Sequence, residues 1–349
     1  MQDRKQEQYS SINGLRAFSA VGILLMHVRL ENDFKIEGFL FNKIIPSFTH
    51  LTLLFMMISG FCMCCGYYEK IKENRISVTE FYSRRYQRIL PYFAILVVLD
   101  LLLGFSKEAA WEAFADLTLT FALLPNFEMS VLGVGWTLGV IFLFYMLFPF
   151  FCFLLKDKKT AWITFAAAVL YQVACASYFM DGAHVVDGFR VKLNFLYCAV
   201  YFVAGGLIYL YRESAVKLAE RYRYLLLVLC IAVWLGYYFV KHSPEVCGLW
   251  YLVLFALMLL YAIGTKGKLL NNRVTDFLSN ISMEVYLCHF GVLRVARKLN
   301  LVYLFGDGIR SYLFTSVFVL AGAVAFSVCT KRVLNSIMAK IQKGGMGNE

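Results

Sequence analysis

The chain has 349 residues, of which 60% are hydrophobic and only 16% are charged, and it carries a net charge of +11. Soluble domains carry about 25% charged residues, so this composition excludes a soluble protein of two or three domains. In so apolar a chain, the placement of the 34 Lys and Arg residues indicates orientation in a membrane and not binding to nucleic acid.

Ten apolar segments follow one another along the chain, most of them near the roughly 20 residues that a helix needs to cross a bilayer. They predict an all-α fold, an integral membrane bundle of about ten transmembrane helices. We expect one domain over residues 1–349, with its core at about 10–330. The predicted spans are residues 14–30, 47–66, 91–105, 131–155, 161–180, 195–211, 224–241, 247–264, 281–296 and 309–329.

The basic residues are distributed unevenly between the two sides of this bundle. If the N-terminus is cytosolic, 23 of the 34 Lys and Arg residues lie in cytosolic segments. This bias follows the positive-inside rule and predicts a multi-pass protein of the plasma membrane with both termini in the cytosol. The tail, residues 331–349, is basic and is predicted to form an amphipathic helix against anionic lipid.

The first predicted span, GLRAFSAVGILLMHV, contains two polar residues, Arg16 and His27. They are eleven residues apart, almost three helical turns, so both project from one helix face about 16 Å apart along the axis. Polar residues inside a span are costly, and each is a candidate for function. The alternative is that Arg16 is a snorkelling anchor and His27 a packing residue.

A second polar group, FYSRRYQRILPYF at residues 81–93, precedes the third span. Pro91 suits the first turn of a new helix. Arg85 and Arg88 are three residues apart and share a helix face. Their guanidinium groups match the geometry of phosphate oxygens, which predicts an anion site. Ordinary positive-inside anchoring is the alternative, and composition alone favours it.

The ten cysteines lie mostly in apolar segments, where they pack as small apolar side chains. Cys62, Cys64 and Cys65 are close together, but no His is near them in sequence and no second Cys pair follows. This pattern disfavours zinc, whose ligands usually come in two such groups. We therefore expect no metal site.

Four segments have a distinctive order and spacing. The first span contains Arg-x10-His, LFMMISGFCM contains Ser-Gly-Phe from Ser59, and RRYQRILPYF contains Arg-x-x-Arg-Ile-x-Pro. SNISMEVYLCHFGVL contains Tyr-Leu-x-His, with Tyr286 and His289. Together these segments resemble the acyltransferase-3 family of multi-pass membrane acyltransferases. The resemblance extends over roughly residues 10–330.

A fifth segment, GWTLGVIFLFYMLFP, departs from the family's Trp-Ser-Leu pattern. Trp136 and Tyr145 agree with it, Thr137 stands in place of the Ser, and Ile141 occupies the place where many members carry Glu. Any role of that carboxylate is either missing from this protein or performed by another residue. The remaining acids inside predicted spans are Asp100 and Glu284.

The resemblance implies an acyl-coenzyme A donor, usually acetyl-CoA, that approaches from the cytosol as a co-substrate, with no permanently bound cofactor. It implies as acceptor a hydroxyl group on a polysaccharide or glycolipid of the cell envelope. Arg85 and Arg88 can hold the phosphates of the donor, and His27 can take the proton of the attacking hydroxyl. Arg16 is the second catalytic candidate. The possible acceptor or supporting residues are Ser59, Trp136, Tyr145, Glu284, Tyr286 and His289.

Two other kinds of protein fit the same composition. Charges inside the membrane also mark transport pathways, so a carrier or flippase for a lipid-linked sugar is the alternative function. Such a carrier would not depend on coenzyme A. A structural or sensory membrane protein without turnover is the third possibility, and nothing in the sequence favours it.

Overall fold

The computed structural model describes residues 9–124, 133–185, 189–240 and 243–345, and every regular element in these ranges is helical. The prediction of an all-α fold is therefore confirmed. The α-helices are α2 (Ser11–Leu30), α3 (Ile45–Ser47), α4 (Leu51–Met63), α5 (Glu69–Lys72), α6 (Val78–Leu103), α7 (Lys107–Thr118), α8 (Trp136–Leu154), α9 (Lys158–Ala174), α10 (Phe195–Leu210), α11 (Arg212–Arg221), α12 (Arg223–Gly236), α13 (Pro244–Gly264), α14 (Arg273–Asn280), α15 (Ser282–Lys298) and α16 (Ile309–Gly345).

Short π- or 3₁₀-helical segments join or extend these helices. They are η1 (Leu40–Ile44), η2 (Phe48–His50), η3 (Cys64–Tyr68), η4 (Phe121–Leu123), η5 (Cys175–Phe179) and η6 (Val191–Leu193).

Seven helical stretches in the described ranges are long and apolar enough to cross a membrane, and a bent pair raises the number to eight. The predicted count of ten is therefore not confirmed. The bent pair is α10 with α11, which meet at 84°. Predicted span 224–241 corresponds to α12, which has only 14 residues. Predicted span 281–296 corresponds to α15, where Glu284 and Arg294 lower the apolar character.

Parts of three predictions lie outside the described residues. These are residues 131 and 132 at the start of span 131–155, residue 241 at the end of span 224–241, and residues 346–349 at the end of the tail.

The prediction that Pro91 begins a helix is wrong. Helix α6 begins at Val78, because the side chain of Ser77 accepts a hydrogen bond from the backbone N–H of Glu80 and caps the helix there. Pro91 lies in the interior, where its missing N–H leaves a carbonyl one turn earlier without its usual partner. The consequence is that Arg85 and Arg88 belong to the same helix as the span that follows them.

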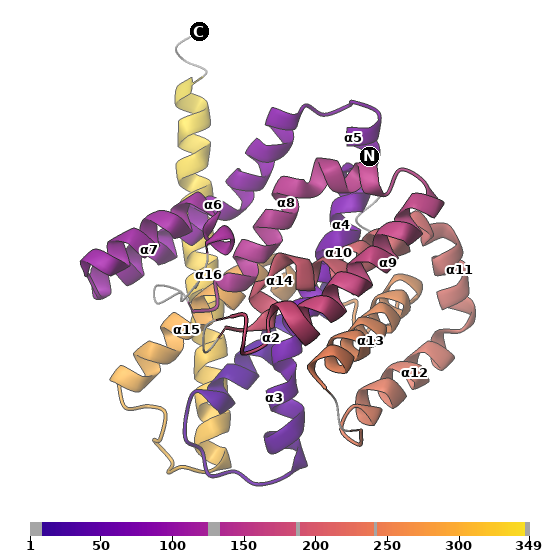
Figure 1. Ribbon diagram of the computed structural model, residues 1–349. Coiled ribbons are helices and arrows are strands. Elements are labelled where there is room, and N and C mark those ends of the chain that lie inside the picture. Colours follow the sequence, from indigo (N-terminus) through magenta and orange to yellow (C-terminus); the bar gives the residue numbers. More distant parts are fainter. Residues whose placement is uncertain (1–8, 125–132, 186–188, 241–242, 346–349) are drawn as a thin grey trace.

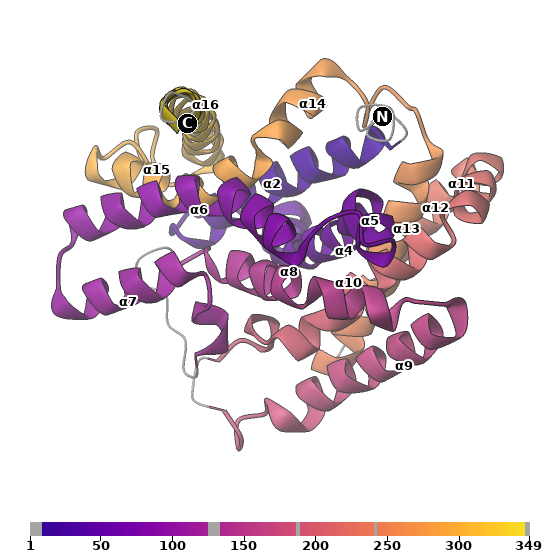
Figure 2. The same ribbon diagram turned by 90° about the horizontal axis from the view of Figure 1, so that it is seen from above.

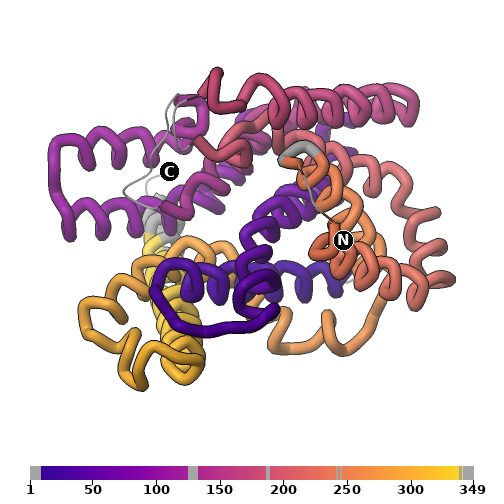
Figure 3. Tube along the Cα trace, turned by 60° about the horizontal axis from the view of Figure 1, so that its bottom comes forward, coloured from indigo at the N-terminus to yellow at the C-terminus, as the bar shows by residue number. Residues whose placement is uncertain are grey.

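The helices form a bundle around two apolar cores. In Figures 1 and 2, α15 and α16 form one flank, α11 to α13 form the opposite flank, and α4, α8 and α10 lie between. One core lies between α4, α8, α10 and α13. The other gathers residues of α2, α6, α15 and α16. Figure 3 shows α15 and α16 side by side, and α2 packs against both.

Two glycines allow α4 and α10 to cross at very short range. A Cβ atom at Gly205 in α10 would lie 2.2 Å from the carbonyl oxygen of Met57. A Cβ atom at Gly60 in α4 would lie 2.3 Å from the carbonyl oxygen of Phe202. Small residues permit such close backbone approach between membrane helices. The crossing therefore requires glycine at both positions.

The last helix, α16, runs without a break from Ile309 to Gly345 and extends beyond the rest of the bundle (Figure 1). The predicted span 309–329 and the described part of the tail are thus one continuous helix. A candidate membrane span of 29 residues, Ile309–Ile337, lies within it. Contact of the tail with lipid stays a prediction.

Candidate functional site

The centre of the candidate site is a pair of histidines on two neighbouring helices. His27 lies in the last turns of α2, and His289 lies in α15, which packs against α2. Their ring centres are 5.2 Å apart, with an angle of 38° between the rings. Phe290 packs edge-on against His27, with ring centres 4.7 Å apart. The structure therefore brings together two predicted site residues that are 262 positions apart in sequence.

The surroundings of His289 fix which ring nitrogen carries its proton. Its side chain is 1% exposed, and Nδ1 lies 2.6 Å from the backbone carbonyl oxygen of Tyr286. A carbonyl oxygen can only accept, so Nδ1 is the protonated nitrogen. In the neutral ring, Nε2 then carries a lone pair. This buried nitrogen has no hydrogen-bond partner in the described part of the chain.

Tyr286 joins this pair to the beginning of α8. Its hydroxyl group donates to Thr137 Oγ1 at 2.8 Å or to the carbonyl oxygen of Val134 at 3.0 Å. Thr137 is the residue that stands in place of the family's Ser, and it is buried. Its hydroxyl group keeps the polar contact that a Ser would provide, so this departure from the family pattern is chemically conservative.

Arg16 lies on the same unbroken helix as His27, and its side chain is half-buried. The continuous helix places the two residues about 16 Å apart along the axis. Within residues 9–345 as described, the guanidinium group has neither a hydrogen bond nor an ion pair. A cation without a protein partner inside an apolar bundle is suited to an anionic ligand.

Arg85 occupies a half-buried position between aromatic rings. Its Nη2 donates to the hydroxyl group of Tyr67 at 2.5 Å, and its guanidinium lies over the rings of Tyr67 and Tyr145, 4.6 Å and 5.8 Å from their centres. Tyr67 is presented by the π-helical segment η3, a form of helix frequently found at functional sites. The structure thus brings two predicted residues together, since Tyr145 contacts Arg85.

Arg88 and Ser59 have looser surroundings. Arg88 is exposed one turn after Arg85, and Ser59 is half-buried in α4. Neither side chain has a hydrogen bond or ion pair within the described ranges.

The two acids considered as replacements for the family's Glu are held by cations of neighbouring helices. The Glu284 carboxylate is 4% exposed and lies 3.2 Å from Lys331 of α16. The Asp100 carboxylate lies 2.6 Å from Arg294 of α15. Because His289 bonds a backbone carbonyl instead, its orientation does not depend on either carboxylate.

A cavity of about 230 Å³ opens beside the beginning of α8. Trp136 lines it together with Phe189 and Asn194 from the segment before α10, and with apolar residues around η4. An aromatic pair with a carboxamide is a combination suited to a sugar, because apolar ring faces and hydroxyl groups both find partners. Trp136 directly precedes Thr137, the contact of Tyr286.

Lys192 is a residue that the sequence analysis missed. It lies in η6, donates a hydrogen bond to Thr49 Oγ1 at 3.1 Å, and is within electrostatic range of His27 together with Arg190. Burial lowers the pKa of the Lys192 ammonium group to about 8. In the sequence, a single Lys before an apolar segment cannot be distinguished from a membrane anchor.

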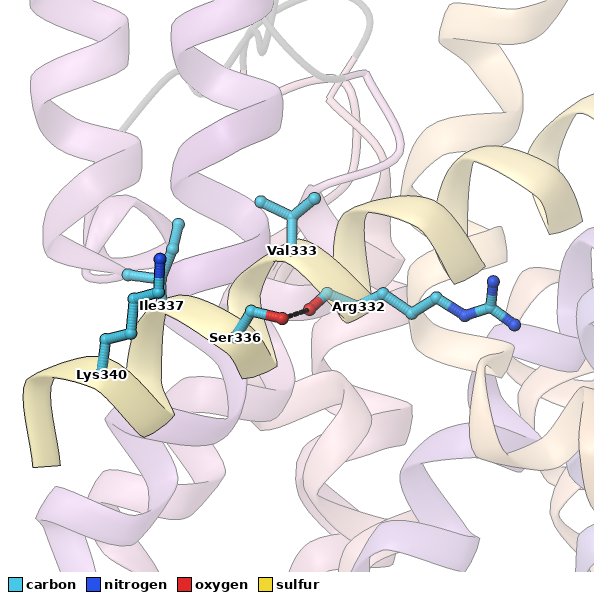
Figure 4. A pocket seen from close by; sticks show the side chains of 5 residues that line it. All are labelled: Arg332, Val333, Ser336, Ile337 and Lys340. Atoms are coloured by element: carbon cyan, nitrogen blue, oxygen red, sulfur yellow. Dashed lines mark hydrogen bonds between the residues drawn. The ribbon is translucent and has the colours of Figure 1, made fainter. Parts of the chain in front are cut away.

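A larger hollow of about 340 Å³ lies on the C-terminal part of α16 and includes none of the predicted site residues (Figure 4). Its lining side chains come from successive turns of this one helix: Arg332, Val333, Ser336, Ile337 and Lys340. A hollow on one helix cannot surround a substrate, so we assign no chemistry to it.

Comparison with known proteins identifies the family. The chain matches the acyltransferase-3 model, described as an acyltransferase domain, over residues 9–331. Neither a curated protein nor a solved structure shows a significant match to the chain. The matched range includes every predicted site residue and extends into the last of the helices suited to cross a membrane. The chain therefore belongs to the acyltransferase-3 family and is a multi-pass membrane acyltransferase.

Proposed function

We propose that the chain transfers an acetyl group from cytosolic acetyl-CoA to a hydroxyl group of a polysaccharide or glycolipid of the cell envelope. The observation that carries this proposal is the histidine pair inside a bundle of the acyltransferase-3 family. A neutral imidazole enclosed among helices, as His27 is, offers the lone pair that acyl transfer to a hydroxyl requires.

The donor side of the site consists of arginines. Arg88 is exposed and Arg85 is half-buried on the same face of α6, so the phosphates of coenzyme A can bind at the surface while the pantetheine arm enters the bundle. Arg16 is half-buried in α2 and has no partner among the described residues. In this proposal the arm follows the face of α2 from Arg16 towards His27.

The proton transfer is assigned to His27. As the acceptor oxygen attacks the thioester carbonyl carbon, the new C–O bond forms, and His27 takes the hydroxyl proton. When the C–S bond breaks, that proton passes to the leaving thiolate, so the histidine returns to its neutral form. Atoms and charges balance without a further reactant.

The acceptor side is assigned to the cavity beside α8. Trp136 and Phe189 offer aromatic faces to a sugar ring, and the amide group of Asn194 offers a hydrogen-bond donor. The cationic residues Arg190 and Lys192 make an anionic envelope sugar a favourable acceptor.

The proposal includes a single domain in the plasma membrane with both termini cytosolic. Asn13 near the start of α2 donates to Asp276 of α14 at 3.0 Å, and Lys331 in the second half of α16 donates to the carbonyl of Asn280 at 2.6 Å. Because α14 has only eight residues, these two ends lie on one side of the bundle. The positive-inside bias assigns that side to the cytosol.

A C-terminal reporter that is active only outside the cytosol should stay silent. A strong signal from this reporter would refute the proposed orientation.

The experiment that tests the function is mass spectrometry of envelope glycans from cells with and without the protein. We expect an acetyl mass increment on one glycan only when the protein is present. Isolated membranes with the protein should also release free CoA from added acetyl-CoA. If the protein changes the amount of a sugar lipid on the outer surface without CoA release, it is a carrier and the proposal is wrong.

The arginines of α6 yield a testable prediction about the donor. Changing Arg85 or Arg88 to Ala should raise the apparent KM for acetyl-CoA roughly tenfold, because a charge-assisted contact to phosphate is lost. Changing either to Lys should restore only part of the affinity, since an ammonium group keeps the charge but not the planar fork. The measurement is CoA release as a function of acetyl-CoA concentration in isolated membranes.

Arg84 is the matched control for this prediction. It lies on the same helix, is exposed, and is already paired with Glu80. Exposed pairs of this kind contribute little to stability, so Arg84→Ala should leave both membrane insertion and donor affinity unchanged. If the KM for acetyl-CoA is unchanged in both the Arg85 and the Arg88 variants, these residues are ordinary membrane anchors and do not bind the donor.

A further inference from the structure

The lone pair on Nε2 of His289 has no role in the mechanism described above. The nitrogen is buried, and the described residues offer it no partner. Leaving a buried acceptor without a hydrogen bond costs about 1 to 3 kcal/mol. Because Nδ1 is held by the Tyr286 carbonyl, the ring cannot turn over to relieve this without losing a 2.6 Å hydrogen bond.

His27 is the neighbouring group that can donate to this nitrogen. Two imidazoles joined by an N–H···N bond of ordinary length have ring centres at about the observed separation of 5.2 Å. His27 is half-buried and makes no hydrogen bond among the described residues, so its ring is free to rotate against the edge of Phe290. Rotation of this ring can direct one of its N–H groups at Nε2.

We propose that His289 is the positioning residue for His27: its Nε2 accepts a hydrogen bond from one ring nitrogen of His27 and thereby leaves the lone pair of the other nitrogen facing the acceptor hydroxyl. The inference rests on the proposed function. A neutral imidazole has one N–H and one lone pair, so fixing the N–H fixes the basic nitrogen. A carboxylate has this task in Ser-His-Asp sites, whereas here the task is performed by a second imidazole.

This arrangement also fits the departure at Ile141. Asp100 and Glu284 are paired with Arg294 and Lys331, and in the described chain neither carboxylate is hydrogen-bonded to His27. His289 supplies a neutral acceptor, and a neutral group costs far less inside a bilayer than an ionised acid.

Two substitutions of His289 separate its two hydrogen bonds. Gln places a carbonyl oxygen near the position of Nε2, so His289→Gln keeps an acceptor for His27. Asn places its amide near the position of Nδ1, so His289→Asn keeps the bond to the Tyr286 carbonyl and removes the acceptor.

The measurement is CoA release from acetyl-CoA by isolated membranes that contain the cell's own glycans, normalised to folded protein. We expect the Gln variant to keep at least about a third of the maximal rate and the Asn variant to lose roughly a hundredfold, with an unchanged KM for acetyl-CoA in both.

Every other pattern overturns the inference. Retained activity of the Asn variant with loss in the Gln variant would mean that only the anchor to Tyr286 matters. Equal loss in both would make His289 a base or a packing residue, and equal retention would leave it without a role. His184→Gln is the matched control, because this exposed histidine is paired with Asp181 on the surface. If the wild-type protein itself releases no CoA, the proposed function is wrong. If the wild-type protein and both His289 variants transfer the acetyl group at normal rates, the proposed function stands and only the positioning role of His289 is refuted.

A measurement on the unsubstituted protein covers the case in which a variant does not fold. The chain has five histidines, so ¹⁵N-labelled imidazoles can be resolved by NMR. We expect one ring with a protonated Nδ1 and an unprotonated, hydrogen-bonded Nε2, whose Nε2 resonance moves when His27 is changed to Gln. A resonance that is unaffected by His27→Gln would overturn the proposal.

Discussion

Changing His27 to Ala is expected to lower acyl transfer by on the order of a hundredfold or more, which is the usual contribution of a general base. The protein should still insert, because removing a polar group from a span eases insertion. His27 is half-buried, and the change leaves space beside Phe290 without removing any hydrogen bond seen in the described chain. The measurement is acyl content of the envelope glycan, normalised to the amount of variant in the membrane.

His27→Gln distinguishes catalysis from packing. Gln retains the capacity for hydrogen bonds but cannot take a proton near neutral pH. A packing histidine should tolerate this change, whereas a catalytic one should not. Near-normal acylation by the Gln variant would remove His27 from the mechanism.

Changing Gly205 to Ala is expected to destabilise the protein by about 2 to 3 kcal/mol or to prevent its accumulation. The new Cβ would meet the carbonyl oxygen of Met57 at 2.2 Å and the backbone nitrogen of Phe61 at 2.7 Å. Backbone atoms cannot move aside as a flexible side chain can, so α4 and α10 must separate. The measurement is the midpoint of thermal unfolding in detergent, together with the yield of monodisperse protein.

Gly66→Ala is the matched control. Gly66 is also helical, but a Cβ there meets nothing within 4 Å. Because Ala costs less backbone entropy than Gly in a helix, this variant should be neutral or slightly more stable. Equal melting temperatures for the two variants would show that the close crossing of α4 and α10 does not limit stability.

The sequence was sufficient for the fold class and for most helices, because apolar segments of membrane length are a strong local signal. It was less reliable where local and tertiary effects compete. Pro91 has the properties of a first-turn residue, yet the Ser77 cap begins the helix earlier. Helix α15, the counterpart of predicted span 281–296, has 17 residues and contains Glu284 and Arg294, so it is not among the helices long and apolar enough to cross a membrane.

The candidate site likewise has features that the sequence predicts and features that only the three-dimensional structure shows. The face shared by Arg16 and His27 follows from helix periodicity alone and is present in α2. The contact between His27 and His289 joins the first and the penultimate long helix, and no local pattern encodes such a pairing. Nor could the sequence predict that Nδ1 of His289 bonds its own helix, which decides where the lone pair lies.

The length of α16 determines how far the C-terminal end stands from the lipid. A helix of 37 residues is about 55 Å long, whereas the hydrocarbon layer of a bilayer is about 30 Å thick. About 25 Å of this rod therefore lies outside the hydrocarbon when the helix stands upright. As a continuous helix up to Gly345, it is a rod whose last turn keeps a fixed distance from the part that lies in the hydrocarbon.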